Sequence, residues 1–392
     1  MKTRQPGVLL LAVTLLLDGR RAGAEPMAGS TTALSPAASA VVNGNAGGGA
    51  TWFDAVWRAA DLYHDENAPV VQHVRFTGRF QLDYARVPEG DFEDWHVRRL
   101  RLGLAAACLH QWSAHVEVDL QPQEQEVYQR LTEAHVAWSP NPDLTFKLGK
   151  HSASFTLDGS TPSRELLTLE RNNLANNLWF PQEYFPGVSV SGRRRDWRWT
   201  LGAYSAGSNS REFGRFNGGV FALATIGCDL AARLNVQKAA LTLNYVCQER
   251  DRDNSFTRPL ANVASLNFTL EHGRWGLRGD LSGGLGYGGQ SDVWGAVLLP
   301  SFHLTPKLQA VARLTWLESL DPNGLRFARY EDHVVSGRGD HYREIYLGLN
   351  YYLYGHKLKL QTGAQYAEMR DRAGDGGAYA GWAWTSGLRL SW

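Results

Sequence analysis

Residues 98–120 read RRLRLGLAAACLHQWSAHVEVDL and contain two runs in which apolar residues alternate with polar or small ones. The apolar phase comprises Leu100, Leu102, Leu104 and Ala106, and then Trp112, Ala114, Val116, Val118 and Leu120. The opposite phase comprises Arg99, Arg101 and Gly103, and then Ser113, His115, Glu117 and Asp119. A period of two predicts β-strands with one apolar and one polar face. A turn near His110 then joins two antiparallel strands.

The same alternation recurs along the chain, and sixteen such runs can be counted. One precedes the quoted stretch, with Val74, Phe76, Phe80, Leu82 and Tyr84 in its apolar phase. The thirteen later runs are expected near 131–139, 143–151, 185–193, 196–206, 217–227, 237–248, 258–270, 274–283, 292–304, 307–318, 341–354, 357–369 and 378–392. The pattern leaves the strand ends near 217–236 open.

Connection lengths separate a membrane barrel from a soluble sandwich, which also alternates. Every second connection is short, except the one near 229–236. The others are longer and cover 85–94, 121–130, 152–184, 207–216, 249–257, 284–291, 319–340 and 370–377. Alternating short and long connections are typical of an up-and-down barrel with one rim in the periplasm. We therefore expect an all-β protein, a single transmembrane antiparallel β-barrel of about sixteen strands over residues 70–392.

The N-terminal residues carry the signals of export. Lys2 and Arg4 precede an apolar stretch from Val8 to Leu17, and Ala22–Ala24 has the pattern of a cleavage site. This order predicts a signal peptide over residues 1–24, with an apolar core too short for an uncleaved membrane anchor. Residues 25–50 are rich in small residues and are expected to be a flexible lead-in. Residues 51–69 follow with the spacing of a short amphipathic helix.

The C-terminus agrees with this destination. The chain ends in an alternating strand that finishes on Trp392, which looks like the signal read by the barrel-assembly machinery of bacterial outer membranes. We therefore expect a protein exported to the bacterial outer membrane and surrounded by its lipid.

Charge and composition exclude several classes of protein. The chain of 392 residues has 40 Lys and Arg against 39 Asp and Glu, so no basic excess indicates nucleic acid. Removing residues 1–24 takes away four basic residues and one acidic residue, which leaves 36 against 38 and a net charge of −2. Three scattered cysteines predict neither a disulfide framework nor a zinc site. No cofactor or metal motif stands out, and no enzyme is expected.

The polar phase should line the lumen of a barrel this wide. Its basic residues are Arg75, Arg79, Arg99, Arg101, Lys147, Arg198, Arg278, Arg313, Lys359 and Arg389. Its acidic residues are Asp83, Glu117, Asp119, Glu133 and Asp280. Ten against five predicts a preference for anions, because confined water focuses the field of nearby charges. The alternative is a lattice of cross-strand ion pairs that holds the wall together.

The longest connection, 151–184, contains too many leucines to be a solvated loop. Loops of this length are usually functional, and we expect this one to fold into the lumen as a constriction. Ser160, Thr161, Ser163, Arg164 and Arg171 are its candidate anion ligands. Two arginines against Asp158, Glu165, Glu170 and Glu183 give the loop a net charge of −2, which favours a less specific channel.

An ordered set of short motifs resembles the phosphate-selective porin O and P family over about Val70–Trp392. The motifs are Arg98–Leu104, Glu133–Val136, Leu148–Lys150, Glu170–Arg171 and Pro186–Gly192. The resemblance implies a sixteen-stranded, trimeric barrel in which inward arginines, with Arg99 and Arg101 among them, and the third outer loop shape an anion path. Two positions depart from the family pattern: His135 replaces a tyrosine, and residues 151–155 read HSASF.

Three functions compete with an anion-preferring porin that passes phosphate or similar solutes. The first is a general, non-selective porin. The second is an outer-membrane hydrolase, which the sequence disfavours because no Ser and His with an orienting Asn or Asp stand out at the outer rim. The third is a surface-binding barrel that uses loops 207–216 and 319–340, whose mixed charges are typical of solvated surface.

Overall fold

A computed structural model describes residues 52–178, 183–206, 211–214, 216, 218–252, 254, 257–327 and 329–392. The predicted signal peptide, the lead-in, and Trp179 and Phe180 lie outside these residues. Among the described residues, no helix has both the length and the apolar character needed to cross a membrane.

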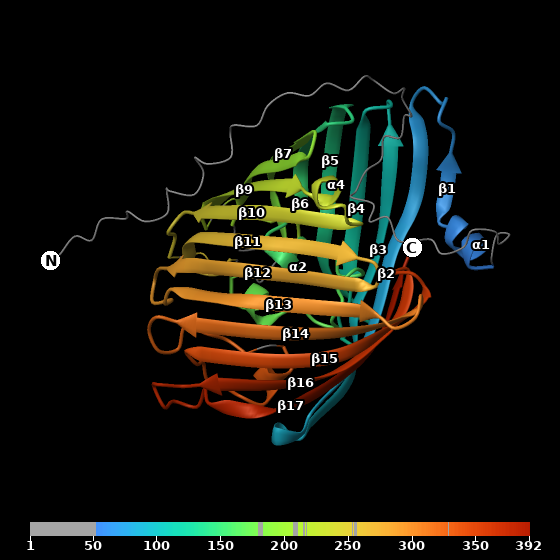
Figure 1. The fold of residues 1–392 in the computed structure, drawn as a ribbon. Coiled ribbons are helices and arrows are strands. Elements are labelled where there is room, and N and C mark those ends of the chain that lie inside the picture. The colour runs from blue at the N-terminus through green and yellow to red at the C-terminus, as the bar shows by residue number, and fades with distance from the viewer. Residues whose placement is uncertain are drawn as a thin grey trace. The chain divides into compact units, whose positions relative to one another are not determined.

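Sixteen antiparallel strands, β2 to β17, pair in chain order and close into a barrel, which confirms the predicted fold. Figure 1 shows them side by side, with α1 and β1 at one end. The strands are β1 (Asp61–His64), β2 (Val71–Val87), β3 (Phe92–Cys108), β4 (Trp112–Leu120), β5 (Tyr128–Asn141), β6 (Leu144–Ser152), β7 (Tyr184–Arg194), β8 (Trp197–Ser205), β9 (Val220–Asp229), β10 (Lys238–Gln248), β11 (Leu260–His272), β12 (Trp275–Gly286), β13 (Val293–His303), β14 (Leu308–Ser319), β15 (His341–Tyr354), β16 (Leu358–Arg370) and β17 (Tyr379–Ser391). The helices are α1 (Trp52–Arg58), α2 (Leu157–Ser160), α3 (Asn173–Leu178), α4 (Ala231–Leu234), and the 3₁₀ turns η1 (Pro88–Gly90) and η2 (Glu331–His333).

The apolar residues of the strands face outward and the polar ones face inward, which is the reverse of the arrangement in a soluble protein. Leu104, Val116 and Leu148 are 52%, 52% and 59% exposed on the outer face, while Arg101 and Asp119 are 1% and 2% exposed inside. Trp112, Trp138 and Phe146 stack across β4, β5 and β6 near the short-turn end, with ring centroids 6.1 and 5.4 Å apart. An apolar outer face with an aromatic girdle is that of a transmembrane barrel.

The barrel closes where β17 pairs with β2, with Ser391 opposite Arg79. Trp392 exchanges backbone hydrogen bonds with Gly78. Its indole ring occupies the space where a Cβ at position 78 would lie, so this position requires glycine. The part of β2 that β17 does not reach pairs with β1 instead, with His64 opposite His73.

The helix expected over 51–69 is shorter than predicted. It ends at Arg58, and Asp61–His64 form β1 instead. The edge of β2 that β17 leaves unpaired explains the difference, because its backbone groups need partners. The buried residue of α1 is Trp57, whose Nε1 donates to the Ser391 carbonyl at 2.6 Å, whereas Trp52 on the predicted face is 67% exposed.

Two long loops fold inward. We call their described residues loop 3 (153–178 and 183) and loop 7 (320–327 and 329–340). Loop 3 buries the predicted leucines, namely Leu166, Leu167, Leu169, Leu174 and Leu178. Leu174 and Leu178 share one apolar cluster with Leu325 and Phe327 of loop 7. The interpretation of 319–340 as solvated surface is therefore wrong, because its apolar residues complete the core around loop 3.

Candidate pore constriction

Wall strands β14 to β17 hold the backbone of loop 3 against the inside of the barrel. Five side chains donate to the carbonyl oxygens of residues 166–170. They are Lys359 Nζ at 2.6 Å and Gln361 Nε2 at 3.1 Å to Leu166, Asn350 Nδ2 at 2.9 Å to Leu167, Arg389 Nη2 at 3.1 Å to Leu169, and Arg313 Nη1 at 2.9 Å to Glu170. Buried carbonyls need such donors. The three cations among them, Lys359, Arg389 and Arg313, therefore hold the loop against the wall.

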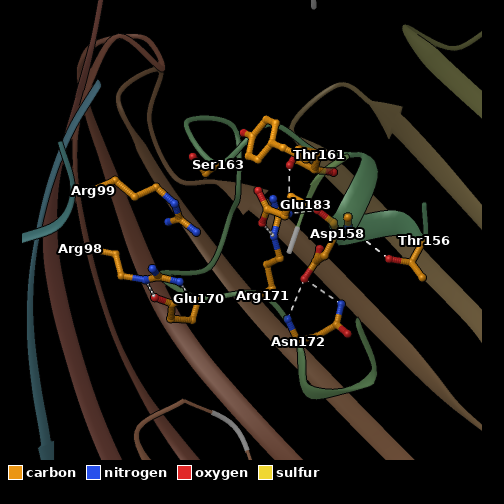
Figure 2. A network of polar contacts seen from close by, with 12 residues as sticks. Arg98, Arg99, Thr156, Asp158, Thr161, Ser163, Glu170, Arg171, Asn172 and Glu183 are labelled. Atoms are coloured by element: carbon orange, nitrogen blue, oxygen red, sulfur yellow. Dashed lines mark hydrogen bonds and ion pairs between the residues drawn. The ribbon is translucent and has the colours of Figure 1, made fainter. Parts of the chain in front are cut away.

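Loop 3 is also braced within itself (Figure 2). One carboxylate oxygen of Asp158 accepts from the backbone N–H and the side-chain amide of Asn172, both at 2.7 Å. Arg171 donates to the Thr161 carbonyl at 3.0 Å and to Glu183 at 3.2 Å. Burial opposes ionisation of Glu183, yet nearby guanidinium groups, Arg171 first, hold the pKa of Glu183 below its usual value. Arg171 is thus a brace within the loop.

Glu170 joins three parts of the molecule. Arg98 of β3 donates to both of its oxygens, and Arg329 of loop 7 lies 3.9 Å away. Burial raises the cost of the charge, but these guanidinium groups outweigh it and lower the pKa of Glu170. Loop 3 is therefore tied to the wall on one side and to loop 7 on the other.

Part of the predicted basic wall forms ion pairs. Arg101 lies 3.2 Å from Asp119 and 3.5 Å from Glu117, and it also donates to the Tyr184 hydroxyl. Arg313 pairs with Glu344 at 2.6 Å, and Arg389 pairs with Asp83. A cation matched in this way adds little to the field in the lumen. For these residues the structure has the ion-pair lattice that was the alternative interpretation.

Two neighbouring guanidinium groups, those of Arg79 and Arg99, differ from these. Arg79 Nη1 donates to Ser163 Oγ at 2.6 Å, and Arg99 Nη1 donates to Gln81 at 2.8 Å. Gln81 in turn donates to Ser163 at 3.3 Å. Figure 2 shows Arg99 extending from the wall toward loop 3. Among the described residues no carboxylate lies within ion-pair distance of either group, and the Nε atom of each is buried without an acceptor.

The other candidate ligands lie elsewhere. Arg75 faces Asp61 of β1 at 3.6 Å, and Arg164 faces Glu165 at 3.3 Å. Lys147 lies on β6 opposite Ser189. Thr161 donates its hydroxyl to the Leu157 carbonyl at 2.8 Å, and the neighbouring Ser160 is exposed. Of the ten candidates, the structure brings together Arg79, Arg99 and Ser163, and reasoning from charge alone missed Gln81, which shares their strand phase.

The sequence profile of the phosphate-selective porin O and P family matches residues 74–278, more than half of the chain. The chain belongs to that family. This membership and the barrel make it an outer-membrane porin. No sequence among curated proteins matches this porin.

Solved structures share the fold of this porin at low sequence identity. OmpF from Salmonella typhi in complex with daunomycin has a TM-score of 0.60 at 9% identity, over 85% of this chain and 100% of that one. An anion-selective porin from Comamonas acidovorans has a TM-score of 0.53 at 13% identity, over 81% and 99%. The outer-membrane channel DcaP of Acinetobacter baumannii has a TM-score of 0.51 at 12% identity, over 82% and 97%.

Proposed function

We propose that this porin passes small solutes by diffusion and prefers anions, phosphate among them, at a constriction formed by Arg79, Arg99 and Ser163. One observation carries the proposal. Arg79 and Arg99 are wall cations that form no ion pair with a described carboxylate. Their guanidinium groups and the Ser163 hydroxyl suit the oxygens of phosphate, because guanidinium groups bind such anions through paired N–H donors.

The runner-up is a general porin without selectivity. It is supported by the ion pairs of Arg101, Arg313 and Arg389. In these pairs a carboxylate offsets the positive charge that each arginine was predicted to add to the lumen. The net negative charge of loop 3 also lowers the expected preference for anions. The two functions differ only in whether Arg79 and Arg99 act on a passing ion, so the same measurement separates them.

The test is the reversal potential of single channels in a planar bilayer under a salt gradient. We expect the wild-type porin to prefer chloride over potassium, and Arg79→Gln with Arg99→Gln to lower that preference several-fold, since a lost charge 4 Å from an ion changes its energy by about 1 kcal/mol even in bulk water. Arg278→Gln with Glu271→Gln is the control, because these two residues face each other at 3.4 Å and their joint removal leaves the net charge unchanged. A wild-type channel without selectivity leaves the general porin, and unchanged selectivity in the double variant would assign the anion preference to other residues.

Phosphate itself needs a second readout. Phosphate added to a chloride solution should reduce the chloride current of the wild-type channel and leave the double variant unaffected. A wild-type current that does not respond to phosphate would restrict the proposal to small anions in general.

We further propose a homotrimer, which the family membership suggests, and the routing that the sequence predicts: cleavage after residue 24, a lead-in over 25–50, and insertion through recognition of Trp392 by the barrel-assembly machinery. The C-terminal strand that ends in Trp392 supports the last step, because its residues pair with β2 and close the barrel.

A further inference from the structure

Two histidines face each other across neighbouring strands inside the lumen. His115 of β4 lies directly opposite His135 of β5 in the strand register. Their ring centroids are 5.9 Å apart and the ring planes are nearly perpendicular, at 89°. Both belong to the inward phase that also holds Glu117 and Glu133. Directly opposite side chains on one face of a sheet are close enough to share a ligand.

One nitrogen of each ring already has a neighbour. His115 Nε2 lies 3.2 Å from the Thr77 hydroxyl. His135 Nδ1 lies 2.8 Å from a carboxylate oxygen of Glu133, although neither of these two atoms has a hydrogen bond among the described residues. This leaves His115 Nδ1 and His135 Nε2. Histidines that bind metals usually have their other nitrogen held by a carboxylate, a carbonyl or water, which fixes the ring and raises its basicity.

We propose that His115 and His135 bind one divalent transition-metal ion, such as Zn²⁺ or Cu²⁺, through these two nitrogens. Imidazole suits these metals, and with metal–nitrogen bonds of about 2.0–2.1 Å two imidazoles on one ion have centroids on the order of 5–6 Å apart. Among the described residues no group of three or more His, Cys, Asp or Glu is arranged to hold a metal, so water completes the coordination.

The next histidine in the row supplies a matched control. His151 lies 5.8 Å from His135 by ring centroids, but both of its nitrogens are engaged. Its Nδ1 lies 3.0 Å from the Gly149 carbonyl oxygen and its Nε2 lies 3.0 Å from Ser189 Oγ. His151 therefore has no open nitrogen for an ion, and its replacement should leave binding unchanged.

A second imidazole pair must be removed before the test. His64 and His73 lie opposite each other on β1 and β2, with ring centroids 5.2 Å apart, and each faces a carboxylate. We therefore use the full-length chain without a histidine tag and with His64→Asn and His73→Asn as the background. Circular dichroism and thermal unfolding establish that each variant keeps its barrel.

The experiment is calorimetric titration of the solubilised porin with Zn²⁺ at pH 7.5, which does not depend on conduction or on the proposed anion preference. We expect one Zn²⁺ per chain in the background, at least tenfold weaker binding with His115→Asn or His135→Gln, and about 10–100-fold weaker binding with Glu133→Gln. His151→Asn should bind as the background does. Electron paramagnetic resonance of bound Cu²⁺ should show two nitrogen ligands, and one in either single variant. Absence of binding in the background, or equal binding with both histidines replaced, would overturn the proposal.

Discussion

At the scale of single residues, the arginines of the lumen show that a charge acts through its neighbours. Arg101 faces two carboxylates, Arg313 faces a carboxylate and donates to a loop carbonyl, and Arg99 faces a neutral amide. The sequence counts the three alike. Of these three, Arg99 alone forms no ion pair, because the residue opposite it in the strand register is Gln81. The pairing of strands, more than the number of cations, decides the field in the lumen.

Glu331 of loop 7 makes packing of that loop sensitive to pH. Burial raises the pKa of Glu331 from 4.5 to about 7, and its Oε2 is buried without a partner among the described residues. The folded loop therefore favours the protonated form: its stabilisation is complete below pH 4.5 and is lost as the pH rises through about 7. The shift corresponds to on the order of 3 kcal/mol. Hydrogen exchange of residues 320–340, corrected for intrinsic rates, should accelerate between pH 4.5 and about pH 7 and change little above that.

Glu331→Gln should remove this acceleration, since a neutral amide has no proton to lose. The adjacent Asp332→Asn is the control, because Asp332 is exposed and should leave the pH dependence in place. Equal acceleration in all three proteins would show that another group controls the loop.

At the scale of elements, the position of loop 3 depends on donors from neighbouring wall strands. Lys359 and Gln361 both donate to the carbonyl of Leu166. Replacing them with Met and Leu leaves that carbonyl without its two side-chain donors, at a cost of about 1–3 kcal/mol. We predict faster hydrogen exchange of residues 160–172 and noisier single-channel currents. Lys307→Met in an exposed short turn should change neither, and a similar effect there would contradict the role of the two donors.

The elements were largely predictable from sequence, whereas their lateral contacts were not. Alternation gave 341–354 with the same ends as β15 and located the other barrel strands to within a few residues. The helix predicted over 51–69 was too long, because Asp61–His64 form β1 and hydrogen-bond to the edge of β2. The site was harder. Ser163 contacts Arg79 although the two residues are 84 positions apart in the chain, and His115 lies opposite His135 because of the strand register. The alternation of apolar and polar residues predicts neither contact.

At the scale of the whole molecule, the total charge and the charge near the constriction have different consequences. The full chain carries 40 basic and 39 acidic residues, so its net charge gives no preference for either sign of ion. A preference that comes from Arg79 and Arg99 acts over a few ångströms and is screened by salt, because the Debye length falls from about 10 Å at 0.1 M to about 3 Å at 1 M.

We therefore predict that the ratio of anion to cation permeability is highest in dilute salt and approaches one near 1 M. Reversal potentials at a fixed tenfold gradient and increasing mean concentration measure this ratio. A ratio that stays constant over that range would contradict screened cations and indicate direct coordination of the ion.

The seam between β17 and β2 also sets the order in which the chain can fold. Arg389 and Asp83, which meet across it, are 306 residues apart, and Trp57 reaches Ser391 over 334 residues. Contacts of such sequence separation form slowly, since the loop entropy is lost before they give any stability. Until the last strand arrives, β2 keeps an unpaired edge that is prone to aggregate. We therefore expect the contacts of this seam to form late in folding.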